Sequence, residues 1–95
     1  MKIVWHNKAS NDLNLNIKYI AEKSPQNALI VLDEILNLVN SLILFPKKYP
    51  KEFVFNNDNV RFVTRWLFKI IYRVDSDIIY TLRIFNINQN PKGIK

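Results

Sequence analysis

The sequence predicts an α+β domain of two layers, with an N-terminal strand, an antiparallel helical hairpin and a C-terminal antiparallel β-meander. Residues 59–91 alternate between apolar and polar side chains, as the strands of a half-buried sheet do. Two segments before them repeat apolar residues at steps of three and four, which is the period of one helical face. We expect the 95 residues to form a single domain, 1–95, because domains run from roughly 50 to 250 residues.

The N-terminal segment predicts a strand followed by a helix. Residues 2–6 include Ile3, Val4 and Trp5, which favour extended backbone, and the polar pair at residues 7–8 ends the run. The helix is expected to end near Lys23. Its apolar face consists of residues three and four apart: Ala9, Leu13, Ile17, Ile20 and Ala21.

A second helix is predicted to start at Ser24-Pro25, because serine is a favoured N-cap and proline is favoured at the first helical position. It should run to about residue 44, since Phe45 precedes Pro46 and the residue before a proline disfavours the helical conformation. The short link between the helices makes them an antiparallel hairpin. The expected buried stripe consists of Ala28, Leu32, Ile35, Leu36, Val39, Leu42 and Ile43. Leu29, Ile30 and Leu38 widen this stripe, which indicates either a close helix–helix contact or a groove for a partner.

Three strands are predicted at about residues 60–65, 67–75 and 77–87. The small polar residues at 75–77 suit a tight hairpin turn, whereas Trp66-Leu67 is a poorer turn by composition. In the middle strand one face carries Phe68, Ile70, Tyr72 and Val74, and the other carries Lys69, Ile71 and Arg73. We expect the helices to cover one face of the sheet and to leave the other at least partly open. Residues 53–55 could add a short extended piece, and residues 88–95 form a polar tail.

Composition excludes several classes of function. There is no cysteine, and the single histidine, His6, has no cluster of possible ligands near it in the sequence, so we expect no metal site. One glycine is too few for a P-loop or a dinucleotide-binding fingerprint, and we expect no cofactor. No apolar run reaches the roughly 18 residues of a membrane helix, and the N-terminus lacks the apolar run of a signal peptide. We therefore expect a cytoplasmic protein without a membrane partner.

Positive charge is the main functional signal. A net charge of +6 and a pI near 9.7 favour a polyanionic partner such as nucleic acid, an acidic protein or an assembly containing either. The cations are Lys47, Lys48 and Lys51 in a proline-flanked loop, and Arg61, Arg65, Lys69, Arg73 and Arg83 in the predicted strands. Interleaved aromatic residues could stack unpaired bases, and clustered cations could stabilise the extra charge of a pentacovalent phosphate during RNA cleavage. An ordinary basic surface around aromatic core residues explains the pattern equally well.

Short motifs across nearly the whole chain resemble the RelE/ParE superfamily of toxins from type II toxin–antitoxin modules, especially its ParE-like, plasmid-stabilisation branch. Each motif is degenerate, but their order and spacing are together fairly specific. They are Trp5 with Ala9 and Asp12-Leu13; Tyr19-Ile20 with Ser24-Pro25 and Ala28; Leu42 with Phe45-Pro46; Val60-Arg61; residues 68–74; residues 78–84; and Gln89-Asn90-Pro91. The resemblance implies a strand–helix–helix–meander fold and a cognate antitoxin, which would neutralise the toxin through an acidic, apolar segment that folds on binding. We expect Leu29, Leu36 and Leu38 to contact that antitoxin.

The resemblance leaves two mechanisms open. ParE-like members inhibit DNA gyrase, and RelE-like members cut messenger RNA in the ribosome with arginines, lysines and often a late tyrosine or histidine. Asn88 stands where many relatives have an arginine, and no tyrosine or histidine follows it. We therefore expect a toxin that inhibits growth by binding a target such as gyrase.

The alternative is a ribosome-dependent mRNA endoribonuclease with Arg61, Lys69, Arg73 and Arg83 as catalytic cations. In either case Lys47, Lys48, Lys51 and Arg65 are expected to contact the target or its nucleic acid. A third possibility is a non-toxic basic module that binds nucleic acid or protein.

Overall fold

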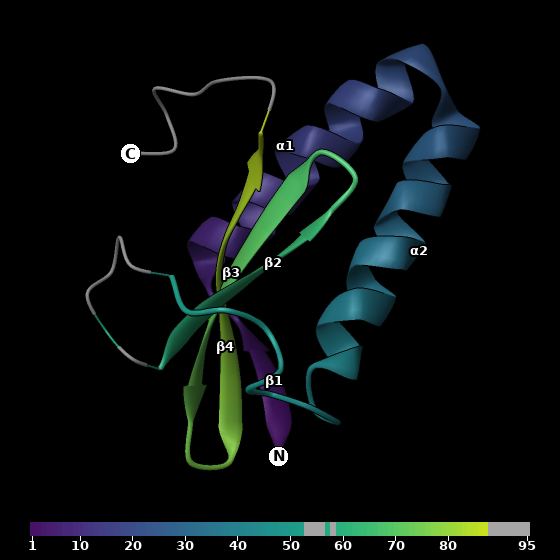
Figure 1. Cartoon of the computed structure of the whole chain (residues 1–95). Coiled ribbons are helices and arrows are strands. Elements are labelled where there is room, and N and C mark those ends of the chain that lie inside the picture. The colour runs from purple at the N-terminus through teal and green to yellow at the C-terminus, as the bar shows by residue number, and fades with distance from the viewer. Residues whose placement is uncertain (53–56, 58, 88–95) are drawn as a thin grey trace.

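The fold places a strand and two helices before three further strands, as predicted (Figure 1). The computed structural model describes residues 1–52, 57 and 59–87, so the predictions for residues 53–55 and 88–95 lie outside it. The elements are β1 (Lys2–Trp5), α1 (Asn7–Lys23), α2 (Pro25–Ser41), β2 (Val60–Arg65), β3 (Phe68–Asp75) and β4 (Ile78–Asn86).

The four strands form one mixed sheet in the order β1-β4-β3-β2. β2, β3 and β4 make the predicted antiparallel meander, and β1 lies parallel to β4, with Lys2 opposite Ile78 and Trp5 opposite Thr81. Within the described residues, the second half of β4 therefore has no neighbouring strand on the β1 side, and α1 packs against β4 instead. At the other edge, residues 50–52 run along β2, where the Phe62 N–H donates to the Pro50 carbonyl (3.0 Å).

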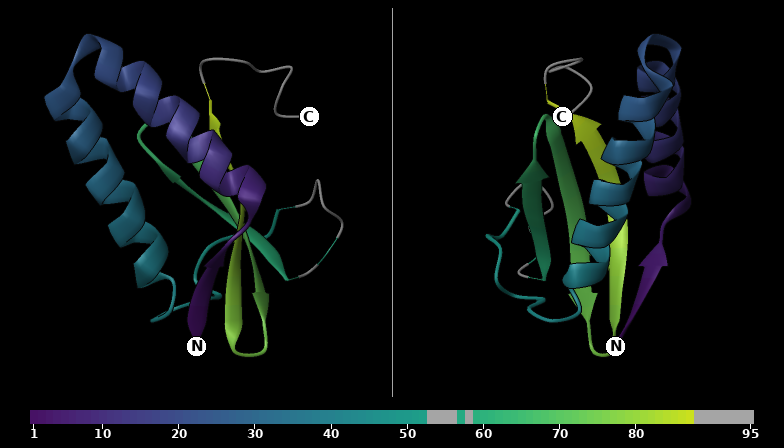
Figure 2. Two further views of the ribbon diagram at one scale, coloured as in Figure 1. Left: turned by 180° about the vertical axis from the view of Figure 1, so that it is seen from behind. Right: turned by 90° about the vertical axis from the view of Figure 1, so that its right-hand side faces the viewer.

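Both helices lie on the same side of the sheet and form the second layer (Figure 2). The view from behind in Figure 2 shows α1 crossing the strands obliquely, with α2 alongside it. The core lies between the layers and includes Ile35, Val39, Leu42, Val63, Phe68, Ile70, Tyr72, Val74, Ile79 and Ile84. The predicted inward face of β3 is thus confirmed. Ile71 lies on the opposite face of β3 and is nevertheless buried. Its neighbours on the adjacent strands are Phe62 of β2 and Arg83 of β4.

The predicted start of α2 is confirmed, and its predicted end is wrong. The Ser24 hydroxyl accepts a hydrogen bond from the Asn27 N–H (3.3 Å), and Pro25 follows directly. The helix ends at Ser41, whose hydroxyl donates to the Leu38 carbonyl (2.6 Å). The Leu42 N–H bonds to the Val39 carbonyl (3.1 Å), and residues 42–44 continue as tighter turns.

The buried stripe of α2 is shifted from the predicted one. Its fully buried positions are Ala28, Val31, Ile35 and Val39, and Leu42 follows beyond the helix end. Leu32 is only partly buried, and Ile43 is exposed because the backbone leaves the helical path after Ser41. The unbroken apolar run at residues 29–32 offers an apolar side chain in every direction, so the sequence pattern does not single out Val31.

Two-residue turns connect the strands of the meander, and both contain a residue with an unusual backbone conformation. Trp66 has a φ of 56° and Ser76 a φ of 30°. Left-handed backbone costs roughly 1–2 kcal/mol in a residue with a side chain, which is why glycine is preferred there. Trp66-Leu67 is therefore a turn despite its composition, and it carries local strain.

Candidate functional site

The structure brings together three of the four candidate catalytic cations. The register places Lys69 beside Phe85, Arg83 beside Ile71 and Arg73 beside Tyr80, on the sheet face that points away from the helices. Arg61 is opposite Tyr72, a core residue, and so lies on the other face of the sheet. The four candidates therefore do not form one cluster.

Each cation on the open face is held by a carboxylate of this chain. Lys69 pairs with Glu52, whose side chain is only 5% exposed. The Arg73 Nε is 3.0 Å from Asp75 Oδ2. Arg83 makes two contacts with Asp12, at 2.8 Å from Nε and 3.1 Å from Nη2. These carboxylates offset much of the positive charge that a phosphate would meet here, although the contact with Asp75 uses only one of the five N–H donors of Arg73.

An aromatic ring also lies beside each of these three cations. The distances to the ring centroids are 4.6 Å for Lys69 and Phe62, 4.7 Å for Arg73 and Tyr80, and 4.6 Å for Arg83 and Phe85. These ring faces are occupied by cations of the same chain, which leaves them poorly placed to stack bases.

Asp12 has a second function besides pairing with Arg83. Its Oδ2 accepts a hydrogen bond from the Ile84 N–H (2.9 Å), in the half of β4 that β1 does not reach. The hydrogen bond from the guanidinium to Asp12 raises the pKa of Arg83 above its usual value, although burial acts in the opposite direction. Arg83 is therefore permanently charged and holds α1 against the sheet.

Arg61 and Tyr72 fasten the loop that follows α2. Arg61 Nη1 donates to the Tyr49 carbonyl (2.8 Å), and the Tyr72 hydroxyl donates to the Pro46 carbonyl (3.0 Å). Burial raises the pKa of Tyr72 to about 12, and the nearby Arg61 only partly offsets this. The phenol is thus protonated at neutral pH and cannot serve as a general base there.

The four predicted target-binding cations occupy separate places. Lys47, Lys48 and Lys51 are exposed on the loop, and Lys51 pairs through its backbone with Arg61 at the start of β2. Arg65 is at the far end of β2 and forms an ion pair with Glu34 of α2. Only Lys47 and Lys48 border a larger hollow in the surface.

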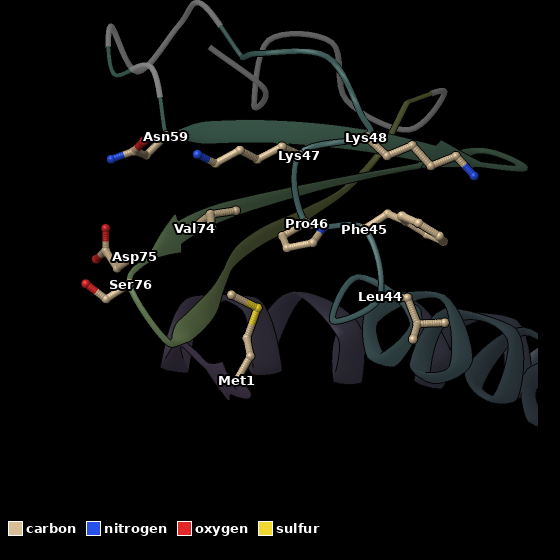
Figure 3. A pocket seen from close by; sticks show the side chains of 10 residues that line it. All are labelled: Met1, Leu44, Phe45, Pro46, Lys47, Lys48, Asn59, Val74, Asp75 and Ser76. Carbon is tan, nitrogen blue, oxygen red and sulfur yellow. The ribbon is translucent and has the colours of Figure 1, made fainter.

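That hollow, here called the basal groove, is formed by residues 1, 44–48, 59 and 74–76 and has a volume of about 770 Å³ (Figure 3). Its apolar part consists of Met1, Leu44, Phe45, Pro46 and Val74. The loop lysines were predictable from the sequence, whereas the groove was not. The available signal was the apolar run before Pro46, which has no place in the helical stripe once α2 ends at Ser41.

The three leucines predicted to contact an antitoxin do not form one surface. Leu29 is 66% exposed, whereas Leu36 and Leu38 are partly buried against the core. Leu38 is nine residues from Leu29, about two and a half helical turns, and so projects from the opposite side of α2. Leu38 also borders a smaller groove with Glu34, Asn37 and Arg65.

Among residues 1–52, 57 and 59–87, no group of three or more histidine or acidic side chains is arranged to hold a metal ion. Neither α1 nor α2, the helices of that part, is long and apolar enough to cross a membrane.

Comparisons with known proteins agree with the fold. The sequence model of a family described as the ParE toxin of the type II toxin–antitoxin system parDE matches residues 3–91. A solved structure of the chromosomal ParDE toxin–antitoxin system from P. aeruginosa superposes with a TM-score of 0.75 and 27% sequence identity. The match covers 93% of this chain and 97% of that chain. No curated protein sequence gives a significant match.

Proposed function

The chain belongs to the ParE toxin family of type II toxin–antitoxin systems, and we propose that it arrests growth by binding DNA gyrase rather than by cutting RNA. Membership of the family makes it the toxin of such a system, with an antitoxin as its partner. The protein target and the mode of inhibition are the parts proposed here.

The observation that carries the proposal is the commitment of the candidate catalytic cations to contacts within the chain. Lys69, Arg73 and Arg83 pair with carboxylates, and Arg61 fastens the loop after α2. A ribonuclease would need cations free to stabilise the phosphate in the transition state, and a base to deprotonate the 2′-hydroxyl. Tyr72 is a phenol whose pKa Arg61 influences, and its raised pKa and buried side chain make it unsuitable as that base.

Exposed apolar side chains favour a protein target instead. At the β2–β3 turn, Trp66 is 57% and Leu67 is 47% exposed, and the Ile87 N–H donates to the Leu67 carbonyl (2.7 Å), which places exposed Ile87 next to them. Tryptophan is enriched among residues that dominate protein–protein binding energy. The positive φ of Trp66 is what a two-residue hairpin turn requires, and here a bulky tryptophan occupies the position instead of glycine. We therefore place the gyrase contact at this hairpin tip, formed by Trp66, Leu67 and Ile87.

The test is the topology of a reporter plasmid in bacterial cells after induction of the chain. We expect the plasmid to lose negative supercoiling as growth stops, and a Trp66→Gly variant to have a much weaker effect. Growth arrest with unchanged plasmid topology and cleaved messages would support the ribosome-dependent endoribonuclease. Unimpaired growth at full expression would instead leave a non-toxic binding module.

A further inference from the structure

We propose that the basal groove is the docking site for an acidic, apolar segment of the antitoxin. The proposal rests on the proposed function only in that a type II toxin has an antitoxin; it does not depend on gyrase as the target. It moves the antitoxin contact from Leu29, Leu36 and Leu38 to the end of α2 and the loop that follows.

The apolar part of the groove is exposed to an extent that calls for a covering partner. Leu44 is 72%, Phe45 is 64% and Met1 is 49% exposed. Figure 3 shows Met1 on one side of the hollow, with Pro46 and Val74 facing it from the other. Contiguous apolar surface of this kind marks interaction sites in soluble proteins. A volume of about 770 Å³ is large enough to take several side chains of a peptide.

The charge of the rim selects an acidic occupant. Lys47 and Lys48 both border the groove, and the one carboxylate in its lining, that of Asp75, is already neutralised by Arg73 at 3.0 Å. A second copy of this chain would bring a net charge of +6 against these lysines. Nucleic acid would satisfy the lysines but would leave the apolar floor uncovered. An extended peptide with alternating acidic and apolar residues matches both parts.

The loop that forms one wall of the groove is hydrogen-bonded to the sheet. The Tyr72 hydroxyl holds the Pro46 carbonyl and the Arg61 guanidinium holds the Tyr49 carbonyl, so the loop carrying both lysines is fastened to the sheet on either side of them. Preorganisation of this kind lowers the entropic cost of binding a flexible segment. In growing cells a toxin of this kind must be bound by its antitoxin, because the free toxin would arrest growth. The antitoxin is therefore the partner expected to cover this surface.

The experiment measures calorimetrically the affinity of each toxin variant for the purified antitoxin of its own toxin–antitoxin pair. Leu44→Ala has a matched control in Leu29→Ala, because both leucines are highly exposed and belong to α2 or its end. The charge-reversal pair Lys47→Glu/Lys48→Glu is matched by Lys8→Glu/Lys18→Glu on α1, which makes the same change in net charge at exposed positions. Unfolding midpoints close to the wild-type value will show that each variant folds.

We expect Leu44→Ala to weaken antitoxin binding about tenfold and the lysine reversal about thirtyfold, with both controls within about threefold of wild type. The lysine reversal should also reduce the dependence of affinity on salt concentration. An effect of Leu29→Ala equal to or larger than that of Leu44→Ala would overturn the proposal, as would equal effects of the two charge reversals.

Growth arrest by the same variants without antitoxin separates this proposal from the proposed function. If Leu44→Ala loses toxicity but keeps its antitoxin affinity, the groove serves the target and the docking proposal fails. If the wild-type chain binds antitoxin through the groove but never alters plasmid topology, the docking proposal stands and the gyrase proposal fails.

Discussion

Asp12 of α1 and Arg83 of β4 form a two-point ion pair, and the same carboxylate receives the Ile84 N–H. The two residues are 71 positions apart in the chain. Their pairing occurs where β1 has ended and β4 would otherwise have an open edge. One carboxylate thus replaces a strand partner for β4 and attaches the helical layer to the sheet.

We expect Asp12→Ala to lower the free energy of unfolding by about 2–3 kcal/mol, because it leaves a half-buried guanidinium and a backbone N–H without their acceptor. Urea denaturation measures the change. Asp33→Ala is the matched control at an exposed position of α2 and should change the free energy by less than about 0.5 kcal/mol. Similar losses in the two variants would show that the Asp12 contacts contribute little to stability.

We expect Tyr72→Phe to make stability less sensitive to alkaline pH. The pKa of Tyr72 is raised by burial from 10.0 to about 12, so the folded state favours the neutral phenol. This contribution to stability is complete below pH 10 and is lost as the pH rises from 10 to 12. Wild type should therefore lose up to about 3 kcal/mol more than Tyr72→Phe over that range.

At neutral pH the Tyr72→Phe variant should be less stable than wild type by about 1 kcal/mol, because it lacks the hydrogen bond to the Pro46 carbonyl. Denaturation curves at several pH values measure both effects. Parallel pH profiles for the two proteins would contradict the assigned burial of the phenol.

We expect Trp66→Gly to keep or raise stability while it removes toxicity. Glycine relieves a left-handed backbone that costs roughly 1–2 kcal/mol, and the exposed indole contributes little to the core. Ser76→Gly is the control for the backbone effect, since Ser76 has a positive φ in the other hairpin. Thermal unfolding measures the stability of each variant, and growth curves after induction measure its toxicity. A large loss of stability in Trp66→Gly would make the tryptophan structural rather than a contact for the target.

We expect the double variant Lys69→Met/Arg73→Gln to arrest growth as wild type does. Arg83 is left unchanged because its loss would also remove the pair with Asp12. Since Lys69→Met removes the ion-pair partner of the buried Glu52, the unfolding midpoint of the double variant is compared with that of wild type, so that a folding defect is not mistaken for a catalytic one. Primer extension on translated messages should show no cuts with either protein. Cuts that appear with wild type and vanish with the double variant would favour the endoribonuclease.

Patterns that depend on neighbouring residues were predictable from the sequence. The Ser24-Pro25 helix start and the inward face of β3 are examples, because capping and alternation are local. The place of β1 beside β4 was not predictable, since a strand of four residues carries no information about its partner. The end of α2 was missed because the apolar run continues from Leu42 to Phe45, and the first proline after the helix is Pro46.

The candidate site was predicted only as a set of cations. The alternation of the strand correctly placed Lys69 and Arg73 on one face. Whether each cation is free or paired with a carboxylate depends on other segments of the chain. Glu52 reaches Lys69 from the loop, and Asp12 reaches Arg83 from α1. The basal groove likewise depends on residues from the N-terminus, the end of α2 and the β3–β4 turn, which only the fold brings together.

Gyrase inhibition is tested most directly by the supercoiling activity of purified DNA gyrase in the presence of the purified chain. We expect the activity to fall as the chain approaches a stoichiometric amount, Trp66→Gly to inhibit far less, and added antitoxin to restore supercoiling. Undiminished supercoiling at a large molar excess of folded chain would contradict this expectation.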